Sequence, residues 1–236
     1  RRYSSAASDV YKRQAMDMHV HFRDPGYTHK EDWKTGSESA ACGGVTAVVD
    51  MPNTNPFTSD YSQFKEKERI AKQKSVVDFG IGINVEENLT EQDWFETVPA
   101  AFWKLYPYGI SSKDYFRLAQ EVLGKTKKPL VVHCEHPDYM HNNPLEKLSD
   151  HTENRLIAEE KCLSEMPPSK YLHVAHLSTS NGLRNLPSQS STEVCPHHLL
   201  LNLDNCSSLD CKVDPPLRTI SDNKTCLLYT SDAADE

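Results

Sequence analysis

Short apolar runs rich in β-branched residues alternate along this chain with longer amphipathic stretches. Strands are predicted at residues 45–51, 76–84, 101–106, 129–134, 171–177 and 191–195, after a first strand that carries His19 and His21. Helices are predicted between them, at residues 61–74, 90–98, 114–125 and 152–165. This alternation is typical of a parallel sheet with helical crossovers. We therefore expect an α/β fold, and in a closed barrel of this kind the chemistry lies at the carboxyl ends of the strands.

Both ends of the chain resemble translations of a sequencing adapter. Residues 4–14 read SSAASDVYKRQ and residues 226–236 read CLLYTSDAADE, which correspond to the two reading directions of one adapter. We expect residues 1–14 and 226–236 to be non-native tails, and we exclude them from reasoning about the fold. Residues 15–225 are then expected to form one partial barrel domain, cut at both ends.

The composition indicates which kinds of binding partner and which cellular compartment suit this protein. The formal net charge of −8 predicts no general affinity for nucleic acid or an anionic membrane. No apolar run approaches the roughly 20 residues of a membrane span. Six of the seven cysteines lie within residues 15–225 without a Cys-x-x-Cys pair, which favours reduced thiols and a cytoplasmic protein. Arg155 and Glu159 are four residues apart in a predicted helix, a spacing typical of a surface ion pair.

The run at residues 17–26, DMHVHFRDPG, combines a candidate metal site with a candidate anion site. His19 and His21 are two apart on a predicted strand, so their imidazoles point to the same face and can reach one metal ion. Arg23 follows on that face if the strand continues, and its guanidinium can grip a substrate carboxylate with two hydrogen bonds. Asp17 lies one layer deeper, where a structural hydrogen bond is the expected role.

Residues that can bind metal recur at the ends of successive predicted strands. They are His19 and His21, then Lys104, His133 and His176. Four imidazoles and a lysine suit a two-metal hydrolytic centre, since imidazole binds zinc well and a metal pair can polarise a carbonyl. A protonated lysine is a poor ligand, but its carbamate would offer two oxygens to two cations. The alternative for Lys104 is an ion pair with an acid at the rim of the barrel.

Other histidines are expected to play no part in metal binding. His173 and His176 are three apart on a predicted strand and face opposite sides, so only one can point into the barrel, and His176 is nearer the strand end. His197 and His198 are adjacent and are expected to diverge for the same reason. We therefore expect no metal role for that pair.

The ordered motifs resemble those of the dihydroorotases of the amidohydrolase superfamily. They include HVHFRDPG at residues 19–26, MPNT at 51–54, KLYP at 104–107, HCE at 133–135, AHLST at 175–179, PHHL at 196–199 and KVDPPLR at 212–218. The resemblance implies a (β/α)8 barrel, here truncated before its last strands. It implies reversible ring closure of N-carbamoyl-L-aspartate to dihydroorotate in pyrimidine synthesis. It also implies a small-molecule substrate, neither nucleic acid nor membrane as partner, and leaves a homo-oligomer open.

The resemblance also implies a ligand set for two zinc ions. His19 and His21 correspond to ligands of the more buried ion, and His133 and His176 to ligands of the second. Lys104 stands where some members hold a carboxylated lysine, whereas other members use an aspartate as the bridging group.

The same resemblance implies a substrate grip and leaves the catalytic base unassigned. Arg23 and Asn53 correspond to residues that hold the substrate carboxylate. The family's base is an aspartate late in the barrel, but Asp210, Asp214 and Asp222 precede or flank the loop that comes before that strand. We expect the base to lie beyond the end of this chain. Asp214 also departs from the asparagine expected in that loop, which puts any substrate contact there in doubt.

Three alternative functions remain. Allantoinases and hydantoinases also open cyclic amides, but a site built around Arg23 and Asn53 for a carboxylate would leave buried charge unpaired beside a neutral ring. A non-catalytic dihydroorotase-like barrel is the third, and such a protein is expected to lose ligands. Retention of all five expected ligands argues against it: His19, His21, Lys104, His133 and His176.

Overall fold

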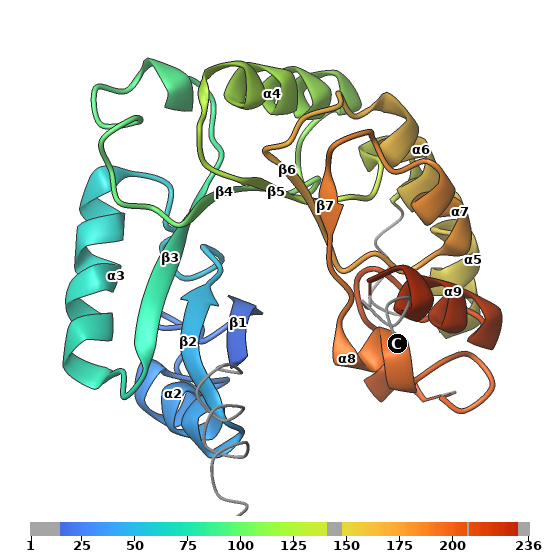
Figure 1. The fold of residues 1–236 in the computed structure, drawn as a ribbon, viewed down its shortest axis with the longest axis horizontal. Helices are drawn as coiled ribbons and strands as arrows, with labels where there is room; N and C mark the ends of the chain where they lie inside the picture. Colours follow the sequence, from blue (N-terminus) through green and yellow to red (C-terminus); the bar gives the residue numbers. More distant parts are fainter. Residues whose placement is uncertain (1–14, 141–147, 207, 231–236) are drawn as a thin grey trace, which may run out of the picture. The chain divides into compact units, whose positions relative to one another are not determined.

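The structure is a computed structural model that describes residues 15–140, 148–206 and 208–230 (Figure 1). The expected tail at residues 1–14, and residues 231–236 of the second expected tail, lie outside this part. The chain divides into two compact units, with the boundary between Lys104 and Leu105. Each unit is described by itself.

Parallel strands in chain order form the sheet of the first unit. Its strands are β1 (Ala15–Val20), β2 (Val45–Asp50), β3 (Asp78–Asn84) and β4 (Phe102–Leu105), whose last residue begins the second unit. Each strand pairs in parallel with the next, and the register matches Val20 to Asp50 and Asn84 to Lys104. Strand ends that carry candidate site residues are therefore aligned within this unit. The crossovers are helical, with α2 (Trp33–Cys42) after β1 and α3 (Tyr61–Lys74) running beside β3 (Figure 1).

Helix α3 has the bounds expected from the sequence, and local chemistry explains both ends. The Asp60 carboxylate accepts the backbone N–H of Gln63 at 2.8 Å, while the Gln63 side chain accepts the backbone N–H of Asp60 at 3.1 Å. This reciprocal pair satisfies two donors that the first helical turn leaves open. Lys72 and Lys74 lie in the last turn, where cations suit the helix dipole.

Strands and short helices also alternate in the second unit. Helix α4 (Ser112–Lys125) precedes β5 (Leu130–His133), which pairs in parallel with β6 (Leu172–Ala175), and β6 pairs in parallel with β7 (Ser191–Thr192). The other helices are α5 (Leu148–Asn154), α6 (Ala158–Glu165), α7 (Ser180–Arg184), α8 (Pro196–Leu200) and α9 (Ile220–Thr230). Within the described residues, 3₁₀ turns lie at Pro137–Tyr139 and Leu209–Cys211 in this unit and at Leu89–Glu91 in the first.

Aromatic and β-branched side chains fill the core of each unit. In the first, the fully buried Trp33 meets Phe22 and Phe79 edge-on, with ring centroids 5.1 and 5.4 Å apart. In the second, Leu130, Val132, Leu172 and Val174 are fully buried on paired strands. Full burial of one such side chain stabilises the fold by about 1.5–3 kcal/mol.

The expected helix at residues 90–98 is wrong. Apart from the 3₁₀ turn at Leu89–Glu91, this stretch forms successive turns. Phe95 and Val98 are buried here, and Phe95 stacks on Trp103 with ring centroids 4.6 Å apart. Tertiary packing therefore decides its conformation.

The expected helix at residues 152–165 is broken, and the expected surface pair of Arg155 with Glu159 is wrong. Arg155 is fully buried and lies at the break between α5 and α6. Its guanidinium pairs with Glu135 at 2.8 Å and with Asp214, whereas Glu159 is buried against the loop after β6. The long-range pairing of Arg155 replaces the local one.

Two further features bear on the sequence expectations. Cys206 and Cys211 form a disulfide, contrary to the expectation of reduced thiols for these two residues, while Cys42, Cys134, Cys162, Cys195 and Cys226 form no disulfide within the described residues. Among the described residues, no helix combines the length and the apolar character needed to cross a membrane.

Candidate functional site

The first unit brings His19 and His21 together at the end of β1. Their ring centroids lie 5.2 Å apart, as the alternation of side chains predicts. Nδ1–H of His21 donates to Oδ1 of Asn53 at 2.8 Å, which leaves Nε2 of His21 to face a ligand. Burial, with help from the nearby His19 and Arg23, lowers the pKa of His21 to about 3. His21 is therefore a neutral imidazole, the form that binds metals. Asp17 accepts the backbone N–H of His19 at 3.0 Å, the structural role expected for it.

Arg23 reaches the same place by a turn and not by an extended strand. Strand β1 ends at Val20, and Arg23 has a left-handed backbone with φ of 60°. Its Nη1 donates to the backbone oxygen of Asn53 at 3.3 Å. Gly26, with φ of 95°, allows this turn to pack closely, because a Cβ there would overlap the carbonyl oxygen of Asn55. The structure thus gathers His21, Arg23 and Asn53.

A buried ion pair holds the turn that follows His21. The Asp50 carboxylate accepts the backbone N–H of Phe22 at 2.7 Å and pairs with Lys67 of α3 at 2.6 Å. Lys67 also donates to the carbonyl of Met51 at 2.7 Å, and both side chains of the ion pair are fully buried. Sequence reasoning missed this pair, although an aspartate that ends an apolar strand and a lysine on the inner face of a helix are its visible signals.

Lys104 is fully buried on β4, opposite Asn84 of β3. Its charge is one of the influences that lower the pKa of His21, so the two side chains lie in the same region of the first unit. A protonated amine cannot ligate a metal ion, so Lys104 would have to lose its charge to join His19 and His21 as a ligand. The two histidines of this unit are donors that fit a metal ion.

The second unit brings His133 and His176 together. His133 ends β5, and His176 follows β6 with φ of 40°. Their ring centroids lie 4.5 Å apart and both are nearly fully buried. Nε2 of His133 lies 2.8 Å from Oε2 of Glu135, the kind of carboxylate contact that orients a metal-binding histidine. The two predicted ligands of the second metal are thus adjacent.

His133 adjoins a network of charged side chains, in which Glu135 and Arg155 are fully buried and the Asp214 side chain is 38% exposed. Arg155 pairs with Glu135 at 2.8 Å and with Asp214, and Nε2 of His151 lies 3.2 Å from Oδ1 of Asp214. Tyr108 donates to Oδ2 of Asp214 at 3.2 Å. Burial alone would raise the pKa of Asp214, but the hydrogen bond from His151 and the charge of Arg155 outweigh it and lower the pKa well below its usual value. Asp214 is therefore ionised and bound by protein donors.

A second buried carboxylate supports the loop that carries His176. Oε2 of Glu159 accepts the backbone N–H and the hydroxyl of Ser178 at 2.9 and 2.8 Å. Oε1 accepts the backbone N–H of Thr179 at 2.8 Å. The Ser-Thr pair that follows the strand was visible in the sequence, but its carboxylate partner was not.

The predicted site residues fall into two sets. His19, His21, Arg23, Asn53 and Lys104 belong to the first unit, and His133 and His176 to the second. Of the aspartates weighed as a base, Asp222 is occupied, because it accepts the backbone N–H and the hydroxyl of Ser180, both at 2.9 Å. The metal and substrate roles of all these residues remain predictions.

The comparisons with known proteins agree with the motifs. Residues 12–107 match the family described as dihydro-orotase-like. A dihydroorotase of Methanosphaera stadtmanae is 36% identical over 234 residues, which covers 89% of this chain and 54% of the relative. This chain is a relative of the dihydroorotases. A second dihydroorotase, of Methanothermobacter thermautotrophicus, is 35% identical over 86% of this chain and 51% of its own length. The chain spans about half the length of these curated relatives.

Solved structures confirm the fold class. L-hydantoinase (dihydropyrimidinase) from Arthrobacter aurescens matches with a TM-score of 0.76 at 23% identity, over 90% of this chain and 54% of that one. A dihydroorotase from Campylobacter jejuni matches with a TM-score of 0.63 at 18% identity, over 90% of this chain and 63% of that one. The predicted α/β fold class, with parallel strands as in these structures, is therefore confirmed, and these likenesses bear on the fold alone.

Proposed function

We propose that the protein to which this chain belongs is a dihydroorotase, which interconverts dihydroorotate and N-carbamoyl-L-aspartate. The observation that carries the proposal is the gathering of His21 and Arg23, which follow β1, with Asn53, which follows β2, in a chain whose named relatives are dihydroorotases. Hydrogen bonds join His21 to the Asn53 side chain and Arg23 to the Asn53 backbone, so a metal ligand and a carboxylate grip would be positioned together.

In this proposal the histidines and the lysine hold two zinc ions. His19 and His21 would hold one ion in the first unit, His133 and His176 would hold the other in the second unit, and Lys104 would add a ligand as a carbamate. Bound zinc would supply Lewis-acid polarisation of the ring amide carbonyl. The low pKa of His21 and the full burial of Lys104 support this assignment, because a ligand must be deprotonated and shielded from competing water.

Arg23 and Asn53 are proposed to bind the substrate carboxylate. One N–H of the Arg23 guanidinium donates to the Asn53 carbonyl, and the group has four more N–H donors. A carboxylate can take two of them side by side, a geometry that lysine cannot offer. This grip distinguishes dihydroorotate from allantoin and from simple hydantoins, whose rings lack that carboxylate.

The test is a substrate comparison. The reading frame is completed from the source DNA, and the protein is expressed with zinc and bicarbonate. Ring opening of dihydroorotate, allantoin and hydantoin is then assayed with the purified protein. We expect selective opening of dihydroorotate, and Arg23→Met should abolish it while Arg184→Met, at an exposed helix position, should not. Turnover of allantoin or hydantoin instead would overturn the substrate assignment. No turnover of any ring by a zinc-loaded protein would favour a non-catalytic barrel.

A further inference from the structure

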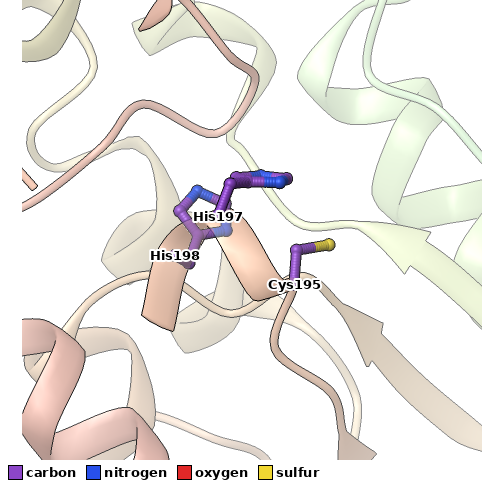
Figure 2. Close-up of side chains that lie close together, drawn as sticks. All are labelled: Cys195, His197 and His198. Atoms are coloured by element: carbon purple, nitrogen blue, oxygen red, sulfur yellow. The ribbon is translucent and has the colours of Figure 1, made fainter. Parts of the chain in front are cut away.

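Three side chains outside the predicted ligand set gather just after β7. Cys195, His197 and His198 each offer one ligand atom, and these atoms all lie within 4.8 Å of one another (Figure 2). Within residues 15–140, 148–206 and 208–230, this is the one group of three histidine, cysteine or acidic side chains close enough to share a metal ion by that measure. The cluster lies wholly within the second unit.

The local backbone explains why adjacent histidines converge, contrary to the sequence expectation. His197 and His198 lie in helix α8, with Cys195 as the residue that caps it. Successive side chains on a helix are about 100° apart, whereas on a strand they point to opposite faces. The two ring centroids are consequently only 4.3 Å apart.

The contacts of His198 suit a metal ligand. Its Nε2–H donates to the carbonyl of Pro215 at 3.0 Å, which fixes the proton on that nitrogen. Its Nδ1 is buried and has no hydrogen-bond partner within the described part of the chain. A buried polar atom without a partner is uncommon and calls for an explanation. A histidine whose second nitrogen donates to a backbone carbonyl is the usual arrangement of a metal ligand.

The donor set selects the class of metal. One sulfur and two imidazole nitrogens suit zinc, whereas magnesium and calcium require oxygen ligands. Bonds of about 2.1–2.3 Å in a tetrahedral site place neighbouring ligand atoms roughly 3.5 Å apart. Atoms up to 4.8 Å apart reach that spacing with inward shifts of about 1 Å or less each, within the range of side-chain rotation.

We propose that Cys195, His197 and His198 bind a zinc ion through the cysteine sulfur and one nitrogen of each imidazole, with water at the fourth position. The ion would fasten α8 to the segment that carries Pro215, through the hydrogen bond of His198. This site is independent of the proposed catalytic ligands, none of which is a cysteine.

Cobalt substitution tests the proposal, because a thiolate bound to cobalt gives a charge-transfer band in the near ultraviolet that histidine ligands do not give. The metal-free 236-residue chain is titrated with Co²⁺. We expect the band in the unmodified chain and in Cys42→Ser, a matched control at an exposed free cysteine, and its loss in Cys195→Ser. His197→Gln should weaken the binding that produces the band. Absence of the band in the unmodified chain, or its survival in Cys195→Ser, would overturn the proposal.

A second measurement needs no variant. The chain is alkylated with iodoacetamide with and without zinc, and modified cysteines are located by mass spectrometry. At a zinc concentration of 100 times the dissociation constant only about 1% of the chain is unbound, so alkylation of Cys195 should slow about 100-fold. Alkylation of Cys42 should keep its rate. An unchanged rate at Cys195 across the zinc series would show that its sulfur binds no zinc.

Discussion

Replacing Lys67 with methionine tests the buried ion pair behind the proposed site. The substitution keeps the length of the side chain but removes the charge that lies 2.6 Å from Asp50. Asp50 would keep only the Phe22 N–H, at 2.7 Å, and the Met51 carbonyl would lose its donor. The Asp50 carboxyl, whose pKa burial already raises, would then remain fully buried without its paired cation.

Removing one partner of a buried pair costs about 3–5 kcal/mol, because the remaining charge is uncompensated. Domains of this kind have a total stability of about 5–15 kcal/mol, so Lys67→Met should remove a large share of it. With a urea dependence of about 2 kcal/mol per molar, a loss of 4 kcal/mol lowers the unfolding midpoint by about 2 M.

Tryptophan fluorescence in urea is the appropriate assay. The chain has three tryptophans, Trp33, Trp94 and Trp103, and all lie in the first unit, where the ion pair lies. Lys65→Met is the matched control, because Lys65 belongs to the same helix and makes an exposed pair with Glu68. That variant should leave the midpoint unchanged, since exposed pairs contribute little.

A second substitution separates loss of charge pairing from loss of packing. Asp50→Asn preserves an oxygen for the Phe22 N–H and removes the negative charge. In combination with Lys67→Met it should leave the chain more stable than Lys67→Met alone, because no unpaired charge remains. The reasoning is refuted if Lys67→Met alone costs less than about 1 kcal/mol, the range of surface pairs, or if adding Asp50→Asn recovers nothing.

Four further outcomes are expected. Glu135→Gln should weaken zinc binding at His133 about 10–100-fold by calorimetry, because the carboxylate that orients the imidazole becomes neutral. Asp214→Asn should lower the urea midpoint at pH 7, and the difference should shrink as the pH falls below about 4, since a carboxylate with a lowered pKa stabilises the fold only while ionised. Asp60→Ala should cost about 1 kcal/mol in the same urea assay by removing the cap of α3. Deleting residues 1–14, proposed as a non-native tail, should leave the midpoint unchanged.

The alternation of strand and helix could be predicted because it is a local signal. Apolar runs of β-branched residues mark β2, β3 and β5, and the charged stretch with Asp60 and Gln63 marks α3 with its true bounds. The strands are shorter than expected, since apolar residues continue beyond the last ladder hydrogen bond. The turns at residues 90–98 could not be predicted from local sequence patterns. Phe95 stacks on Trp103, and no local pattern relates these two positions.

Part of the candidate site was also predictable. His19 and His21 meet because a strand alternates, and His133 meets His176 because parallel strands β5 and β6 end side by side. The convergence of His197 and His198 was not predictable, since it depends on whether the residues after β7 form a strand or a helix. The same pair of residues diverges in one and converges in the other.

The buried carboxylates share a role that the sequence alone concealed. Asp50 holds the backbone of Phe22, next to His21, and Glu159 holds the backbone of Ser178 and Thr179, just after His176. In both units a carboxylate from a later or earlier element fixes the loop that carries a proposed ligand. Burying a carboxylate is costly, and an apolar side chain could pack there without that cost but could not accept a backbone N–H. We interpret these carboxylates as the means by which loops after the strands keep their histidines in position, so variants that remove them should impair zinc binding before they abolish folding.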